Sequence, residues 1–229
     1  HLSIRRQRQM CIRDRDGVAY WMSENGFFRY TGKLESLACL VEDYVYDDIN
    51  TVPKNHIYAG LNNLFGEVTW FYPGSGAASN NRSVTYNYMD STAERPIWTT
   101  SSLARSTWSD SHIFGKPHGT EYDADATSDA TVGNTEGVTT YYEHETGTNQ
   151  IKAGATTAIA ASIQSGDFDL DQRGLAGDGE FMMKIRRVIP DFLQQTGAAR
   201  VTLNLKNYPT DTEASSSLGP FEVDSDTTK

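Results

Sequence analysis

The sequence predicts an all-β fold of antiparallel strands with one short helix near residues 40–50. Short runs rich in Val, Thr and aromatic residues recur along the chain, separated by Gly, Asn, Asp and Pro. Tyr occurs 12 times and Gly 19 times, a composition that suits short strands joined by tight turns. Apolar residues near helical spacing favour a helix in the one segment 40–49.

The expected strands follow from this pattern in chain order. Asn25 and Gly26 form the strongest short hairpin signal, between two aromatic runs. The strands are expected at 17–22, 27–30, 56–60, 67–72, 83–88, 97–100, 104–108, 138–145, 158–168, 181–190 and 200–207. Residues 119–137 have few apolar anchors, which predicts an exposed loop with weak strand character. Residues 221–223 resemble the start of a strand that has no partner, so we expect the chain to be truncated at this end.

Residues 1–15 do not share the pattern, and we expect them to be unstructured. They show no apolar periodicity and no apolar core of a secretory signal. Residues 5–15 can be encoded, in frame, by a DNA string that looks like a widely used transposase-based library adapter. We therefore interpret 1–15 as an adapter-derived artefact and Asp16 as a breakpoint. The alternative is a basic arm that binds nucleic acid or membrane.

Removing that segment makes the chain more acidic. The net charge of the whole sequence is −10, and residues 1–15 contain five Arg and one Asp. The rest therefore has 15 basic and 29 acidic residues, a net charge of −14. Such a surface repels nucleic acid phosphate and argues against an anionic membrane as a partner. Cys39 is the one cysteine left, and in an apolar run it is more typical of a buried hydrophobe than of a nucleophile.

Three units, 18–30, 56–72 and 83–98, share one plan of a short strand, a turn and an aromatic strand. Val84 to Tyr88 followed by Trp98 resembles the rhythm of kelch-like propeller blades, although the glycine pair of such repeats is missing. We expect propeller-like β blades over 16–150 and a truncated, β-sandwich-like region over 151–229. An ordinary antiparallel sandwich in place of the blades stays open.

Alternating carboxylates form the best candidate for a metal site. These acidic residues are Asp167, Asp169, Asp171, Asp178 and Glu180. A calcium loop that begins at Asp167 requires Gly at its sixth position, where Gln172 stands. We therefore expect a solvated acidic face and no metal site, with Asp167, Asp169, Asp171 and Asp178 as the weak candidate ligands.

The histidines do not form a recognisable catalytic or zinc motif. His112 and His118 lie in an expected loop, His56 is distant in sequence, and no spacing fits a zinc signature. His144 stands between two Glu residues, which favours an exposed histidine on a strand. We expect no catalytic residues, no cofactor and no enzymatic activity.

A set of short motifs carries a likeness to a known family. They are 20–22 (YWM), 47–50 (DDIN), 67–73 (EVTWFYP), 86–88 (YNY), 103–108 (LARSTW), 143–147 (EHETG) and 165–169 (SGDFD). Together they resemble virion structural proteins of short-tailed bacteriophages, especially the tail nozzle or packaged-DNA-stabilisation proteins. The likeness covers most of the chain after residue 15.

The resemblance implies a propeller-containing subunit in a homo-oligomeric ring below the portal, next to other head-to-tail proteins. Such a ring lines and closes the DNA exit channel, lets genomic DNA pass without specific binding, and has no membrane partner. It implies a virion location after assembly in the host cytoplasm. Two alternatives stay open: a carbohydrate-binding or carbohydrate-active propeller, such as a receptor-binding protein, because Trp and Tyr can stack on sugars, and a bacterial surface repeat protein.

Overall fold

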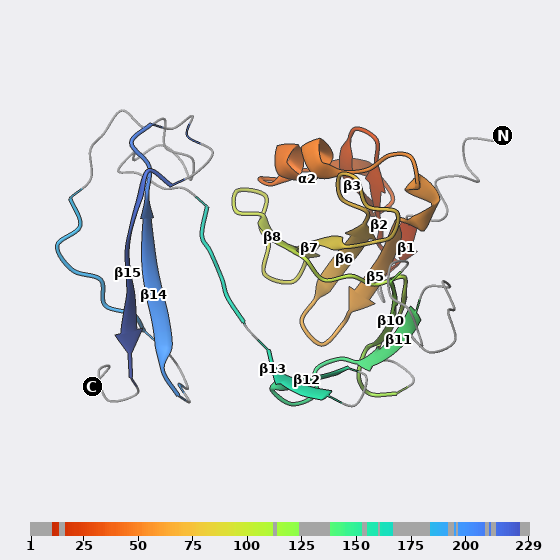
Figure 1. The fold of residues 1–229 in the computed structure, drawn as a ribbon. Coiled ribbons are helices and arrows are strands. Elements are labelled where there is room, and N and C mark those ends of the chain that lie inside the picture. The colour runs from red at the N-terminus through yellow and green to blue at the C-terminus, as the bar shows by residue number, and fades with distance from the viewer. Residues whose placement is uncertain are drawn as a thin grey trace. The chain divides into compact units, whose positions relative to one another are not determined.

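The computed structural model divides into two units, His1–Ile159 and Ala160–Lys229 (Figure 1). It describes residues 11–13, 17–111, 114–123, 138–152, 155–159, 161–166, 184–191, 195, 197–208, 211 and 214–224. The described chain is mostly β, which confirms the expected class, and its sheets are small and antiparallel with no closed barrel among them. Within these residues no helix has the length and apolarity needed to cross a membrane.

Two four-stranded sheets of identical strand order form the centre of the first unit (Figure 1). The first sheet contains β1 (Cys11–Arg13), β2 (Ala19–Ser23), β3 (Gly26–Tyr30) and β4 (Leu34–Leu37). The second contains β5 (Tyr58–Asn62), β6 (Glu67–Tyr72), β7 (Arg82–Asn87) and β8 (Ile97–Ser101). Each strand pairs with the next one along the chain, so both sheets are simple meanders.

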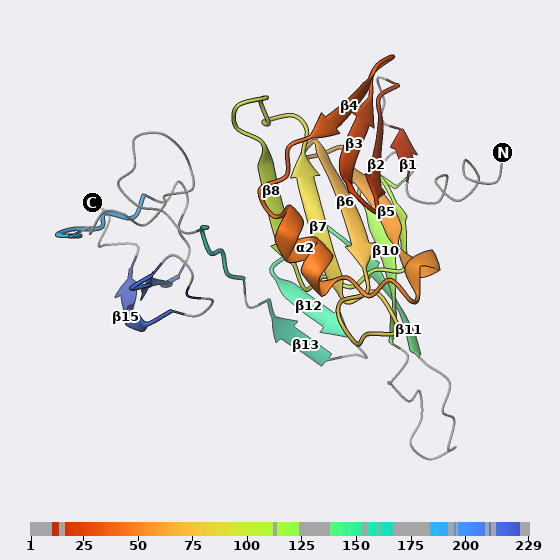
Figure 2. The same ribbon diagram turned by 90° about the horizontal axis from the view of Figure 1, so that it is seen from above.

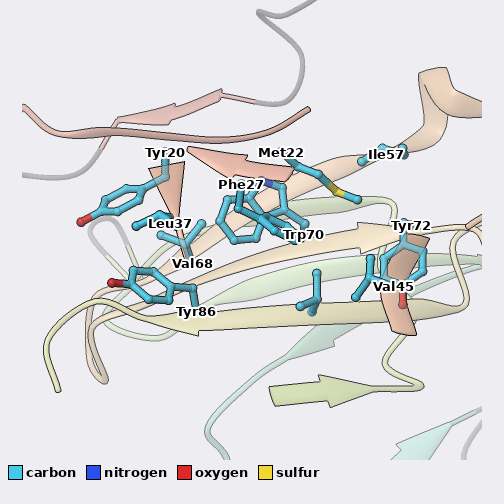
Figure 3. Packing of buried hydrophobic residues seen from close by; sticks show 11 residues of the cluster. Tyr20, Met22, Phe27, Leu37, Val45, Ile57, Val68, Trp70, Tyr72 and Tyr86 are labelled. Atoms are coloured by element: carbon cyan, nitrogen blue, oxygen red, sulfur yellow. The ribbon is translucent and has the colours of Figure 1, made fainter. Parts of the chain in front are cut away.

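The core lies between these two sheets (Figure 3). Side chains alternate along a strand, so Val68, Trp70 and Tyr72 of β6 point to one face, and all three are fully buried. The ring of Phe27 from β3 packs 5.1 Å from Trp70 and 4.7 Å from Trp98, between ring centroids. Full burial of each such side chain stabilises the fold by about 1.5–3 kcal/mol.

The helix α2 (Glu42–Asp48) confirms the helix expected near 40–50 and covers one end of this core. Its Val45 is fully buried. The hydroxyl of Tyr46 donates to the carbonyl of Ser23 at 2.6 Å and accepts from the amide of Gly26 at 3.2 Å, which fixes the helix to the β2–β3 hairpin. At the end of the helix, the carboxylate of Asp48 accepts from Nε of Arg82 at 3.2 Å, and Arg82 belongs to β7 of the second sheet. A short 3₁₀ turn, η1 (Lys54–His56), then leads into β5.

A third sheet packs on the opposite face of the second one (Figure 2). It contains β9 (Thr107–Ser109), β10 (His118–Asp123) and β11 (Val138–Glu143) in the order β11-β10-β9. Phe71 of β6, fully buried on this face, packs 5.6 Å from the ring of Trp108. The indole of Trp108 donates to the carbonyl of Leu61 at 2.6 Å and packs closely against Gly60, which has no side chain to keep it away. A hairpin of β12 (Asn149–Lys152) and β13 (Ala155–Ala158) ends the unit.

The segment 1–15, expected to be unstructured, contains the strand β1, which pairs with β2 over three residues. The difference has a simple physical reason. The outer edge of β2 presents unpaired amide and carbonyl groups, and an open edge pairs with any extended segment that reaches it. The pairing therefore says nothing about the origin of residues 1–15.

In the second unit the structure corrects two expectations. Residues 221–223 do have a partner, because they end β15 (Ser216–Val223), which pairs with β14 (Ala199–Leu205). Residues 158–168 and 181–190 were expected to be long strands, yet 161–166 and 184–190 belong to no strand. A strand requires a hydrogen-bonded neighbour, and an alternating sequence alone does not supply one. Among the described residues this unit has one two-stranded sheet.

Two buried tyrosines should respond in opposite ways to loss of their hydroxyl groups. The hydroxyl of Tyr72 is buried and has no hydrogen-bond partner among the described residues. Tyr72→Phe removes the desolvation penalty of this hydroxyl and should raise the free energy of unfolding by about 1 kcal/mol. Tyr46→Phe breaks two hydrogen bonds and should lower it by about 1–2 kcal/mol. Urea unfolding measures both values. A loss of stability in Tyr72→Phe would show that its hydroxyl has a partner.

Gly60 should tolerate no side chain. A Cβ at this position would lie 2.5 Å from two ring atoms of Trp108, so Gly60→Ala should lower the free energy of unfolding by about 1–3 kcal/mol. Gly166→Ala is the control, because nothing lies within 4 Å of a Cβ there. Equal stability of the two variants in guanidinium unfolding would mean that the third sheet does not pack on β5 as described.

Candidate functional site

The third sheet offers two chemically different faces. Gly119 of β10 lies opposite Trp108 and Tyr142, and these three positions face the second sheet. Thr120 lies opposite Thr107 and Tyr141, and these positions face away from it. Strand alternation therefore separates an inner face, which packs on the second sheet, from an outer face.

The inner face holds a buried polar cluster around Arg105, which is 6% exposed. The Nε of Arg105 donates to Nε2 of His144 at 2.9 Å, and its guanidinium lies 4.1 Å above the ring of Tyr142. A carboxylate oxygen of Glu121 lies 3.7 Å from the guanidinium and accepts from the Tyr142 hydroxyl at 2.8 Å. The amide of Asn80 donates to the carbonyl of Arg105 at 2.9 Å.

The cluster fixes the protonation state of His144. Burial, followed by the charge of Arg105 and the neighbouring His118, lowers the pKa of His144 to about 4. Because Arg105 donates to Nε2, that nitrogen must be unprotonated and the ring neutral near pH 7. Burial also lowers the pKa of Arg105, while Glu121 opposes this shift. Nε2 is the nitrogen of His144 that could accept a proton, and it already accepts the hydrogen bond from Arg105. His144 is therefore poorly suited to accept a proton from a substrate.

The outer face carries a shallow hollow of about 250 Å³. Phe114, His118 and Tyr141 contribute rings, and Thr107, Ser109 and Thr120 contribute hydroxyl groups. The His118 ring packs 4.8 Å from Phe114 edge-on and 5.5 Å from Tyr141, nearly parallel to it. Nδ1 of His118 also bonds the hydroxyl of Tyr141.

The structure places some of the residues singled out from sequence and leaves others undescribed. Asp167, Asp169, Asp171 and Asp178, with Glu180 and His112, lie outside the described residues. In the part of the chain that is described, no three His, Cys, Asp or Glu side chains come together as metal ligands would. His56 is exposed, and its Nδ1 bonds the carbonyl of Ala78 at 2.9 Å.

The expectation for His144 was wrong. It is half-buried and follows β11 directly, instead of standing exposed on a strand. The strand ends at Glu143, and Glu145 adopts a φ of 56°, so the chain turns out of the sheet and His144 points to Arg105. His118 lies on β10, where a loop was expected.

Cys39 is half-buried and packs against the core cluster. Burial raises the pKa of its thiol to about 12. The thiol therefore stays protonated near neutral pH, which makes it a poor nucleophile.

No protein-family model matches this chain, and no curated protein matches it.

Sequence reasoning missed Arg105 and Asn80, the two buried polar residues at the centre of the inner cluster. One signal was available for Arg105: it is the lone charge in the run 101–108. An isolated charge within a strand-like run indicates either an exposed position or a buried, paired one. The sequence does not distinguish these cases, because the partners Glu121 and His144 are distant along the chain.

Stability should fall in mild acid because of His144. An unfolded histidine protonates near its ordinary pKa of 6.5, while His144 in the fold protonates only near about 4. Between these values the unfolded state binds more protons, so the contribution of this group is complete above about pH 6.5 and is lost as the pH falls to about 4. Allowing for solvent screening of a half-buried ring, the loss should be on the order of 2 kcal/mol.

The matched test compares His144→Gln with His56→Gln in denaturant unfolding at pH 7 and pH 4.5. Glutamine can still accept from Arg105 but does not titrate, so His144→Gln should flatten the pH dependence. His56→Gln alters an exposed ring and should retain it. Identical slopes in both variants would contradict the assignment.

Proposed function

We propose that this chain is a structural subunit of a short-tailed bacteriophage virion, a tail nozzle component that closes and lines the DNA exit channel as a homo-oligomeric ring. The observation that carries the proposal is the repeated stacking of antiparallel meanders. Successive sheets pack face to face through aromatic side chains: Phe27 contacts Trp70 between the first and second sheets, and Phe71 contacts Trp108 between the second and third. Propeller blades have this arrangement, which supports a propeller-like first unit.

The charge of the chain supports the role of a channel wall. The net charge is −10 for the whole sequence and −14 without residues 1–15. A negative wall repels phosphate, so DNA would slide past it without specific binding. The function we propose is non-enzymatic. It requires contacts with other copies and with neighbouring head-to-tail proteins in the virion.

The β14–β15 hairpin supports assembly with further copies. Val201 lies opposite Phe221, and Leu203 lies opposite Leu218, so these four side chains share one face. Leu218 is 52% exposed and Phe221 is 54% exposed. An isolated two-stranded sheet is marginally stable in water, and an exposed apolar face of this kind is typical of an interaction surface. A second sheet from another copy would complete the sandwich expected for this region.

Ring assembly should therefore depend on this apolar face. Leu218→Asp places a charge on it and should convert rings to monomers. Ser217→Asp is the matched control, because Ser217 lies on the opposite face, where its hydroxyl bonds Asn204 at 2.9 Å. Electron microscopy and native mass spectrometry of the full-length protein with its portal-side partners measure assembly. Monomers alone in the unsubstituted protein would contradict the proposal, and rings in both variants would exclude this face as the contact.

A further inference from the structure

The outer-face hollow of the third sheet combines ring surfaces with hydroxyl groups in one shallow depression. Phe114 and Tyr141 are 64% and 63% exposed, so their rings are open to solvent. The ring of His118 contacts both Phe114 and Tyr141. We call these three rings the aromatic shelf, because together they offer ring surface to a ligand.

Hydroxyl groups line the hollow beside the shelf. Thr107 and Thr120 lie opposite each other on β9 and β10, with their hydroxyl oxygens 2.8 Å apart. Ser109 lies on the same face, opposite His118. Each hydroxyl can donate one hydrogen bond and accept two, so the pair of threonines keeps free capacity for a ligand.

The lack of charged side chains in the hollow limits the chemical classes of ligand that it could bind. None of the described residues that line it is Lys, Arg, Asp or Glu. Without Lys or Arg it is poorly suited to a phosphate or sulfate, and one imidazole without carboxylates provides too few ligands for a metal ion. A ligand that fits has a neutral surface with both an apolar face and many hydroxyl groups.

We propose that this hollow binds a neutral saccharide. One face of a pyranose ring presents C–H groups that carry a slight positive charge, and they pack on the negative face of an aromatic ring. The ring hydroxyls then meet Thr107, Thr120 and Ser109. At about 250 Å³ the hollow is smaller than the usual range of about 300–1,000 Å³ for enclosing ligand sites, so it holds one or two sugar units laid against the sheet. This inference is independent of the proposed role in a tail ring.

The experiment titrates the full chain with neutral oligosaccharides chosen from a glycan array, followed by NMR or calorimetry. Tyr141→Ala and Phe114→Ala should each weaken binding by about tenfold or more, because each removes part of the shelf. Tyr122→Ala is the matched control. Tyr122 lies on the outer face of the same sheet, is 42% exposed and does not line the hollow, so its loss should leave affinity unchanged.

Equal circular dichroism spectra and melting temperatures for the three variants establish that the fold is intact. Absence of binding to every neutral glycan by the unsubstituted chain would overturn the proposal, as would binding that survives both substitutions. Light scattering tests the remaining outcome: if Tyr141→Ala changes only the oligomeric state, the hollow is a contact between copies and the saccharide proposal fails. Ring assembly disrupted by Leu218→Asp is a separate measurement, so either proposal can fail without the other.

Discussion

The first unit depends on the burial of both faces of β6. Trp70 points to the first sheet and Phe71 points to the third, and both side chains are fully inaccessible to solvent. A strand that is apolar on both faces requires a layer on each side, because either face left open would return a large aromatic surface to water. The three-layer arrangement of the unit is thus a consequence of the sequence at this one strand.

The two interfaces of the central sheet are built from different chemistry. The first is mainly aromatic, and the indole nitrogen of Trp70 and the hydroxyl of Tyr72 are buried there with no hydrogen-bond partner among the described residues. The second combines the Trp108 contact with the charged cluster around Arg105 and Glu121. A buried ion pair adds little net stability, since desolvation offsets much of the attraction, but removal of one partner is costly. The partners in such a cluster interact well only within a narrow range of relative positions. The cluster therefore determines the orientation of the third sheet on the second sheet more than it contributes to the free energy of their packing.

The local sequence pattern was sufficient to predict those strands and helices that are determined by the residues within the segment itself. The expected strand 67–72 coincides with β6, and the helix near 40–50 is α2, since periodicity and turn residues lie within each segment. Pairing over a distance could not be predicted in the same way. The partner of 221–223 lies across an intervening loop, and His144 changes from exposed to half-buried because the chain turns at Glu145. The acidic candidates beginning at Asp167 remain a prediction of sequence alone.

The second unit differs from the first in how its apolar side chains are covered. Its hairpin exposes Leu218 and Phe221 and has no second layer among its described residues. If another copy supplies that layer, the free energy that orders the hairpin comes from association, and the stability of the hairpin then depends on protomer concentration. The first unit buries its own core and does not share this dependence. Under the proposed assembly, the first unit would fold before the copies associate and the hairpin would be completed by association, so association would require enough copies together.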